Sequence, residues 1–318
     1  MSRRYLAAAL LCLVFAGCNR NHKRTIAVIP KATSHLFWVA VQAGSLAAGK
    51  ALHVNVEWNG PASETDYSRQ IQIVDSMIAR RVDGLAIAAT ERKALVQSLD
   101  RAAAAGIPVT VFDSGLDSEN YMTFVATDNV EAGRLAARTM AKLLGGKGQV
   151  AMILHAPGSV STGDREQGFQ EVINREFPQI RIVAEQFGMS DRARSRAAAE
   201  NILSAHPQLD GIFCSTEPSS TGTSLALKSR GLAGKVKFVA FDSSDTMIQD
   251  LRDGVIHALV VQDPFRIGFE AVRTLVDKLN GKTPPKRIDL AARVVTKEQL
   301  DTPEVKELLH PDVKKYLP

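Results

Sequence analysis

The chain has 318 residues, of which 45% are hydrophobic and 23% are charged, and its formal net charge is +5 at pH 7. A chain of this length exceeds the size at which one hydrophobic core usually stops growing, so two domains are expected. Its basic residues are spread among acidic ones and form no stripe, which argues against nucleic acid as a partner.

Residues 1–17 have the pattern of an export signal peptide. A basic start is followed by an apolar run over residues 5–15, and Ala16 and Gly17 precede Cys18. This apolar run is too short for a membrane-spanning helix. A small-residue pair directly before a cysteine resembles the bacterial lipoprotein box, which implies a lipid on Cys18, a place in the cell envelope and membrane contact through that lipid alone. An ordinary signal peptide that is cleaved nearby is the alternative, and the protein is exported in either case.

The first half of the remaining chain alternates short apolar runs with segments of helical periodicity. Strands are expected at residues 25–30, 54–58, 82–87, 106–114 and 123–126. Helices are expected at residues 36–52 and 65–81, in the Ala- and Leu-rich segment before Gly106, and from Asp128-Asn129 to Leu144.

The second half follows the same order. Strands are expected at residues 149–154, 180–187, 209–214, 236–243 and 256–261, with an extended pair at 288–295. Helices are expected at residues 161–177, 191–205 and 244–253, in an Ala- and Leu-rich segment before Gly231, and after Pro264 to Leu279. Strict alternation of strand and helix predicts an α/β protein with doubly wound parallel sheets.

A repeated pattern indicates that the two halves are related. Asp83-Gly84 is followed after 30 residues by Asp113-Ser114, and Asp210-Gly211 is followed after 32 residues by Asp242-Ser243. Each copy reads as a strand, a helix and a second strand, so the spacing suggests internal duplication. Ligands of open α/β sheets bind beyond the carboxyl ends of the strands, where Asp113 and Asp242 are expected. The repeat therefore predicts a ligand cleft between two lobes.

Eight motifs in a fixed order carry a resemblance to a known family. They are IPKATSHLFWVAVQAG (29–44), VDGLAIAA (82–89), VTVFDSG (109–115), FVATDN (124–129), DREQGF (164–169), HPQLDGIFCSTE (206–217), FVAFDSSD (238–245) and VVQDPFRIG (260–268). In this order they resemble the type I periplasmic solute-binding proteins, the ribose and galactose binders of ABC importers. The resemblance extends from residue 25 to about residue 300.

The resemblance implies two lobes joined by three crossovers. These are expected near Thr127-Asp128, Gln262-Asp263 and Leu290 to Ala292. Behind the signal peptide (1–17), residues 25–127 and 263–291 would form the N-terminal lobe, and residues 128–262 and 292–318 the C-terminal lobe.

The resemblance also places the ligand contacts on residues whose chemistry suits a polyhydroxy ligand. Carboxylates at Asp113 and Asp242 accept hydrogen bonds from neighbouring hydroxyls, and Arg165 offers a planar set of donors. Phe37 and Trp38 offer aromatic faces to the apolar side of a sugar ring. The complete set of expected contacts is Lys31, His35, Phe37, Trp38, Asp113, Ser114, Arg165, Ser190, Thr216, Asp242 and Gln262.

Three of these positions differ from the ribose binders. Lys31 and His35 stand where those proteins have small or amide side chains, and Ser114 stands where they have arginine. The Ile-Pro-Lys opening and the Trp-Asn-Gly-Pro turn (58–61) resemble the autoinducer-2 and rhamnose binders of the same family. Lys31 pointing into the cleft would favour a carbonyl, a carboxylate or dense hydroxyls, and a surface lysine is the alternative. The prediction is a sugar or sugar-like ligand, and the residues do not select which one.

The predicted function is capture of this ligand between the lobes, closure by a hinge motion and delivery to the permease of an ABC importer. Delivery to a membrane sensor is the alternative partner. A carbohydrate-active enzyme, which would also use paired carboxylates, is the alternative of a different class. The seven histidines show no metal-binding spacing, no catalytic motif is present, and neither a metal nor a cofactor is expected. A transcription factor is excluded, because the first core strand begins at Thr25 and leaves no room for a DNA-binding domain.

Overall fold

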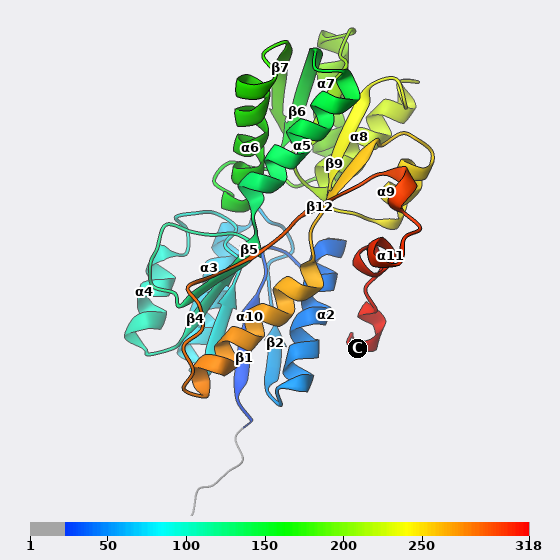
Figure 1. Cartoon of the computed structure of the whole chain (residues 1–318). Helices are drawn as coiled ribbons and strands as arrows, with labels where there is room; N and C mark the ends of the chain where they lie inside the picture. Colours follow the sequence, from blue (N-terminus) through cyan, green and yellow to red (C-terminus); the bar gives the residue numbers. More distant parts are fainter. Residues whose placement is uncertain (1–22, 318) are drawn as a thin grey trace, which may run out of the picture.

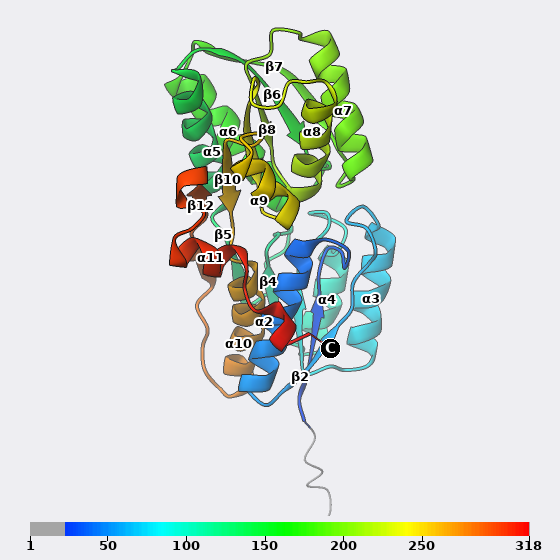
Figure 2. The same cartoon turned by 90° about the vertical axis from the view of Figure 1, so that its right-hand side faces the viewer.

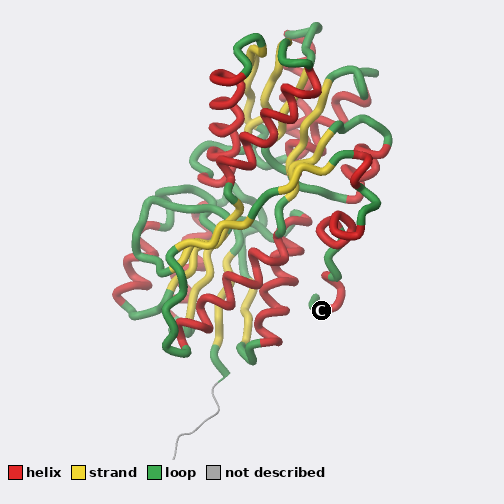
Figure 3. The backbone as a smooth tube through the Cα atoms, in the orientation of Figure 1, coloured by secondary structure: helices red, strands yellow, loops and turns green. Residues whose placement is uncertain are grey.

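Two α/β lobes are stacked end to end, and the chain passes between them three times (Figure 1). The computed structural model describes residues 23–317. In each lobe the helices lie on both sides of a central sheet (Figure 3). The expected fold of two doubly wound lobes is confirmed.

The sheet of the N-terminal lobe has six strands, and every neighbouring pair in it is parallel. Its order is β11 (Arg287–Leu290), β5 (Thr123–Thr127), β4 (Val109–Phe112), β3 (Gly84–Ile87), β1 (Thr25–Ile29) and β2 (Asn55–Trp58). The helices of this lobe are α2 (Leu36–Ala51), α3 (Tyr67–Ala79), α4 (Val96–Ala104) and α10 (Pro264–Leu279).

The sheet of the C-terminal lobe repeats this plan with one difference. Its order is β12 (Arg293–Val295), β10 (Ala258–Val261), β9 (Lys237–Phe241), β8 (Gly211–Cys214), β6 (Gly148–Leu154) and β7 (Ile180–Phe187). The edge strand β12, part of the extended pair expected at 288–295, is antiparallel to β10. The carboxyl ends of both sheets face the cleft, so a chain that leaves β11 enters the second sheet from its carboxyl edge and must run against it. The helices of this lobe are α5 (Asn129–Leu144), α6 (Val160–Glu176), α7 (Arg192–Ala205), α8 (Glu217–Ser229) and α9 (Asp245–Arg252).

The apolar strands are buried on both faces, as parallel sheets covered by helices require. Successive side chains of a strand point to opposite faces. In β1, Ile26 and Val28 pack into one core cluster, and Ala27 and Ile29 pack into another on the opposite side of the sheet. The short uninterrupted apolar runs of the sequence are therefore strands with two buried faces.

The first members of the sequence repeat have the same structural role in both lobes. Asp83 accepts a hydrogen bond from the backbone N–H of Thr25 at 2.7 Å, and Asp210 accepts one from Gln149 at the same distance. Each aspartate thus satisfies a backbone donor at the start of the neighbouring central strand, which explains why the Asp-Gly pair recurs.

The chain ends in a tail that contacts both lobes (Figure 2). It contains η1 (Lys297–Gln299), α11 (Pro303–Leu309) and η2 (Val313–Lys315). Val305 and Leu309 belong to the core of the C-terminal lobe, whereas the ring of Tyr316 lies 5.7 Å from that of Phe265 at the start of α10. Although residues 292–318 were assigned to the C-terminal lobe, the last of the described residues lie against the N-terminal lobe.

Candidate functional site

Asp113 and Asp242 directly follow the equivalent strands β4 and β9, one in each lobe. Both have left-handed backbone conformations, with φ of 55° and 66°. This conformation is uncommon for residues other than glycine, although aspartate tolerates it better than most. Both carboxylates are buried, and both line one cavity between the lobes. The repeat therefore preserves a backbone geometry that turns two carboxylates into the same space.

The cavity has a volume of about 30 Å³ and is lined almost entirely by polar and aromatic side chains. Nine of the eleven expected contact residues line it: Lys31, His35, Phe37, Trp38, Asp113, Arg165, Thr216, Asp242 and Gln262. The other residues of its wall are Glu64, Ser161, Thr162, Glu217 and Pro218.

The remaining two expected contacts, Ser114 and Ser190, do not line this cavity. The hydroxyl of Ser114 accepts a hydrogen bond from the backbone N–H of Ser161 at 3.3 Å and so connects the two lobes. Ser190 follows β7 with a φ of 55°, and its hydroxyl is buried without a hydrogen-bond partner among residues 23–317.

Arg165 is fixed in place by three contacts within the C-terminal lobe. Its guanidinium donates to Asn129 Oδ1 at 2.8 Å and to the Ser215 carbonyl at 3.0 Å, and it lies 4.0 Å from the centre of the Phe241 ring. The close packing of α5 against α6 sets its position, because a Cβ on Gly133 would lie 2.0 Å from the Arg165 carbonyl oxygen. A positive charge is thus held rigidly beside Asp242.

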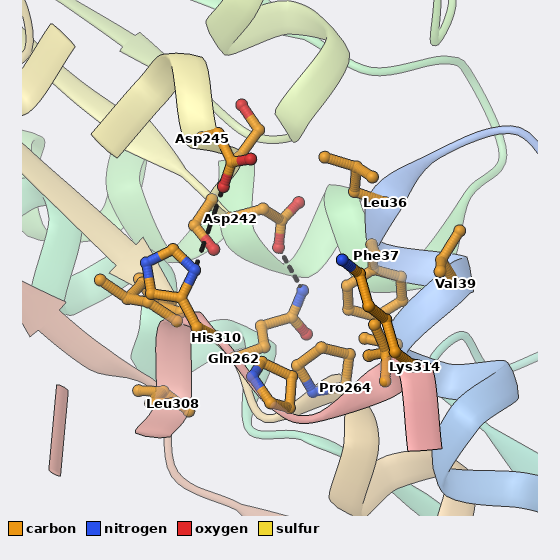
Figure 4. Close-up of a pocket in the computed structure, with 17 residues that line it drawn as sticks. Leu36, Phe37, Val39, Asp242, Asp245, Gln262, Pro264, Leu308, His310 and Lys314 are labelled. Carbon is orange, nitrogen blue, oxygen red and sulfur yellow. Dashed lines mark hydrogen bonds and ion pairs between the residues drawn. The ribbon is translucent and has the colours of Figure 1, made fainter. Parts of the chain in front are cut away.

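Gln262 and Asp242 are hydrogen-bonded at the second crossing between the lobes (Figure 4). The amide of Gln262 donates to Asp242 Oδ1 at 2.7 Å, and its oxygen accepts from the Thr127 hydroxyl at 2.7 Å. The other carboxylate oxygen of Asp242 accepts from the backbone N–H of Glu217 at 3.2 Å. These bonds fix the orientation of the amide and of the carboxylate together.

Burial controls the ionisation of both strand-end carboxyls. It raises the pKa of Asp113 to about 6, although the nearby charges of Lys31 and Arg165 act in the opposite direction. Burial also raises the pKa of Asp242, against the charge of Arg165 and the hydrogen bond from Gln262. Removal from water disfavours the charged form, so a ligand that donates hydrogen bonds would stabilise both carboxylates.

Glu64 is a buried member of the cavity wall that the sequence reasoning missed. It accepts a hydrogen bond from Trp38 Nε1 at 2.8 Å and lies 3.1 Å from His35 Nδ1. Its other oxygen lies 3.2 Å from Lys31 Nζ and 3.2 Å from His155 Nε2. The only available sequence signal was its place in the loop after β2, at the carboxyl edge of the sheet where ligand sites form.

The contacts around Glu64 shift the pKa values of the glutamate and of two neighbouring histidines. Burial alone would raise the pKa of Glu64, but the charge of Lys31 and the bonds with His155 and His35 hold it well below its ordinary value. The pKa of His35 is raised, because its bond to Glu64 and the charge of that carboxylate outweigh the effect of burial. Burial and the charge of Lys31 lower the pKa of His155. Glu64 is therefore ionised at neutral pH.

Glu217 is a second cavity residue that the sequence reasoning missed. Its Oε1 accepts from Arg192 at 2.7 Å and from the Thr221 hydroxyl at 3.0 Å. Its Oε2 is buried without a partner among the described residues. The signal was present, because Glu217 directly follows the expected contact Thr216 at the start of α8.

The two aromatic residues after β1 have different roles. Trp38 is 2% exposed and packs in the core of the N-terminal lobe as well as against the cavity. Phe37 is partly exposed and meets the Trp38 ring edge to face, with centroids 4.9 Å apart. Trp38 thus anchors Phe37, which offers its ring to the space between the lobes.

A second cavity of about 400 Å³ adjoins the first and shares Phe37, Asp242 and Gln262 with it (Figure 4). Its remaining walls come from the start of α2, the residues before and at the start of α9, and the tail at residues 308–314. His310 in the tail lies 4.0 Å from Asp245 in this wall. The tail therefore closes one side of the space next to the candidate site.

No group of three or more metal-ligating side chains occurs within residues 23–317. Cys214 is buried beside Thr223, and burial raises the pKa of its thiol to about 12, which makes it unreactive. No helix in this part of the chain is long and apolar enough to cross a membrane. The expected signal peptide and the lipidated Cys18 lie outside the described residues.

A cleft between two α/β lobes, with buried charged groups from both lobes facing one cavity, defines a protein that encloses a small polar solute. The model of the periplasmic binding protein domain matches residues 26–283. The chain belongs to this family, which confirms the resemblance found in the sequence. Family membership implies a periplasmic location.

Relatives of known structure or name support the same assignment. The chain is 30% identical to a D-ribose/D-allose-binding protein of Pseudomonas aeruginosa, over 89% of this chain and 93% of that protein. A carbohydrate transporter solute-binding protein of Agrobacterium radiobacter, solved with D-arabinose, is 32% identical with a TM-score of 0.88, over 91% of this chain and 99% of that chain. An ABC transporter solute-binding protein of Agrobacterium vitis, solved with D-fucose, is 34% identical with a TM-score of 0.87, over 90% and 100%.

Proposed function

We propose that this chain is the sugar-binding protein of an ABC importer. It encloses a monosaccharide or a similar polyhydroxy ligand between its lobes and presents the closed form to the permease. The observation that carries this proposal is the convergence of Asp113 and Asp242, from equivalent strand ends of the two lobes, on one cavity that Arg165 also lines. Carboxylates and a guanidinium form strong hydrogen bonds with hydroxyl groups, and they do so from opposite sides of the ligand.

Ligand capture requires the lobes to separate and close. The cavity volume of about 30 Å³ is far below the roughly 300–1,000 Å³ of pockets that hold small-molecule ligands. Lys31 Nζ donates to the Ser159 hydroxyl at 2.9 Å, and the backbone N–H of Arg92 donates to the Gly158 carbonyl at 2.9 Å. Both bonds join the lobes, so they break when the cleft opens and re-form when it closes over the ligand.

The comparisons support a pentose or hexose as the ligand. The named relative binds D-ribose or D-allose, and the two solved neighbours hold D-arabinose and D-fucose. Because Lys31 lines the cavity, an autoinducer-2-like or rhamnose-like ligand is the second candidate. The same binding chemistry would serve a membrane sensor in place of a permease. Co-purification of the tagged protein with membrane proteins distinguishes these two partners.

The proposed activity is binding without chemical change, from an anchored position in the envelope. Cys18 carries the lipid in this proposal, and mass spectrometry of the mature protein tests it. For the ligand, the test is a thermal-shift screen of D-ribose, D-allose, D-arabinose, D-fucose and rhamnose, followed by recovery of the bound molecule. A sugar at a hundred times its dissociation constant should add about 2.7 kcal/mol to the free energy of unfolding. The proposal fails if no sugar shifts the transition, or if the recovered molecule is chemically altered.

A further inference from the structure

We propose that Glu64 makes the cleft select uncharged sugars over sugar acids, because its carboxylate neutralises the ammonium group of Lys31. This inference rests on the proposed function and narrows the ligand class of the same cavity. A lysine in a sugar cleft would by itself favour a ligand with a carboxylate. The pairing with Glu64 reverses that expectation.

The geometry shows that the charge of Lys31 is already compensated. Lys31 is 2% exposed, and its Nζ lies 3.2 Å from Glu64 Oε2 and 2.9 Å from the Ser159 hydroxyl. Glu64 is itself only 7% exposed and is held in place by Trp38 Nε1 at 2.8 Å. A buried charge pair with these additional hydrogen bonds has little freedom to separate.

The contacts of Glu64 come from both lobes. His35 Nδ1, in the loop before α2, lies 3.1 Å from one of its oxygens, and His155 Nε2, after β6 of the C-terminal lobe, lies 3.2 Å from the other. Glu64 therefore remains part of the wall in the closed form, in which the ligand is held. The negative charge of Glu64 therefore acts on the ligand in the closed complex, whose stability determines the affinity.

The balance of charge around the cavity leaves no cation for a ligand carboxylate. Lys31 and Arg165 are its buried cations, and Glu64, Asp113 and Asp242 are three buried carboxyl groups beside them. His35, whose pKa is raised, also lines the cavity, but it is paired with Glu64 at 3.1 Å. The fourth acid, Glu217, is paired with Arg192 at 2.7 Å. A ligand that brought a further negative charge into this wall would lose its hydration without gaining a counter-ion. A neutral sugar has no such cost.

Removing the charge of Glu64 should reverse this preference. In Glu64→Gln the amide keeps the size of the side chain and can still accept from Trp38, but Lys31 becomes an uncompensated cation. A carboxylate on the ligand would then find a partner. Lys31→Met should disfavour a ligand carboxylate more strongly than the wild type does, because Glu64 stays negative without its cation. The double variant removes both charges and should return to the behaviour of the wild type.

The experiment compares each neutral sugar with its own uronic acid. The neutral probe is the tightest binder among D-allose, D-fucose and D-galactose, because a pentose has no carbon outside its pyranose ring to carry the carboxylate. The charged probe is the uronate with the same configuration and a carboxylate at the terminal carbon, which is D-galacturonate for D-fucose and D-galactose. Titration calorimetry at pH 8, which favours neutral imidazoles, gives the ratio of the dissociation constants of acid and neutral sugar.

We expect the wild type to bind the neutral sugar at least about a hundredfold more tightly than the acid. In Glu64→Gln this ratio should fall by at least about tenfold, and in Lys31→Met it should rise. Glu171→Gln is the matched control, since Glu171 is a carboxyl on α6 that lies outside the cavity wall and pairs with Arg134 at 2.8 Å. Its ratio should equal that of the wild type.

Three results would overturn the inference: equal affinity of the wild type for acid and neutral sugar, an unchanged ratio in folded Glu64→Gln, or a fall in the ratio in Lys31→Met. If thermal unfolding shows that Glu64→Gln does not fold, Lys31→Met decides the question alone. Failure of every neutral sugar and every acid to bind the wild type contradicts the proposed function instead, so the two failures are distinguishable.

Discussion

The amide of Gln262 donates a hydrogen bond to the Asp242 carboxylate at 2.7 Å, and the amide oxygen accepts one from Thr127 at the same distance. Thr127 ends β5 at the first crossing between the lobes, and Gln262 lies at the second. A candidate ligand contact is therefore connected directly to a segment in which the chain crosses between the lobes. In the proposed hinge closure, this amide would link that crossing to the orientation of the Asp242 carboxylate.

The first prediction concerns Thr127, which does not line the cavity. In Thr127→Val the Gln262 oxygen loses its donor, so the amide no longer has a fixed orientation toward Asp242. Affinity for the cognate sugar should fall about fivefold, which corresponds to the loss of about 1 kcal/mol. Titration calorimetry measures it. Thr139→Val, which removes a hydroxyl bonded to the Leu135 carbonyl within α5, is the control and should keep the wild-type affinity. Equal affinity in both variants would show that Gln262 needs no orientation by Thr127.

The second prediction concerns the two strand-end carboxylates. Asp113→Asn and Asp242→Asn each remove a charged acceptor, and each should weaken sugar binding tenfold to a hundredfold, or by about 1.5–3 kcal/mol. Asp117→Asn is the control, because Asp117 pairs with Arg92 at 2.7 Å outside the cavity. If both cavity variants bind the sugar as tightly as the wild type, the cleft is not the ligand site.

The third prediction is a pH dependence of binding that arises from Asp113. Burial raises the pKa of this carboxyl to about 6, so it is ionised at pH 7.5 and largely protonated at pH 5. The ionised form accepts hydrogen bonds from the ligand, and affinity should therefore fall by about tenfold as the pH decreases through this range. Calorimetry between pH 5 and pH 8 measures the change. In Asp113→Asn the profile should become flatter, and an unaltered slope would assign the titration to another group.

The fourth prediction concerns stability and Glu166. Burial raises the pKa of its carboxyl from 4.5 to about 7. Between these two pH values the folded protein holds a proton that the unfolded chain releases, so this group stabilises the fold at low pH and loses that contribution as the pH rises through 7. The unfolding free energy of Glu166→Gln minus that of the wild type at the same pH should be about 2–3 kcal/mol higher at pH 8 than at pH 5. Urea unfolding at both pH values tests this, and a difference of the opposite sign would contradict it.

The fifth prediction uses the packing that positions Arg165. A Cβ on Gly133 would lie 2.0 Å from the Arg165 carbonyl oxygen, so Gly133→Ala must push α6 away from α5. Stability should fall by about 1–3 kcal/mol, and sugar affinity should fall with it because Arg165 moves. Gly163→Ala lies on α6, the helix that carries Arg165, with nothing within 4 Å of the added methyl group. This control should be neutral or slightly stabilising, since alanine favours a helix. Urea unfolding and calorimetry on both variants separate the two effects.

The sequence by itself determined the fold, and the expected contacts include nine of the fourteen residues that line the cavity. Short apolar runs identified the strands because both faces of each sheet are buried, and the repeat placed Asp113 and Asp242 at equivalent strand ends. These features depend on local periodicity and on the order of elements along the chain, and both can be read without coordinates.

Only the tertiary structure decided which side chains share the cavity and which of them are already paired. Glu64 and Glu217 lie in positions that no periodic pattern distinguishes. Ser114 and Ser190 lie outside the wall, although Ser114 directly follows Asp113. Because Glu64 pairs with Lys31, the charge of that lysine is neutralised and does not favour an anionic ligand. Such pairings depend on contacts between loops far apart in the chain and on burial that strengthens them, and these arise only when the two lobes meet.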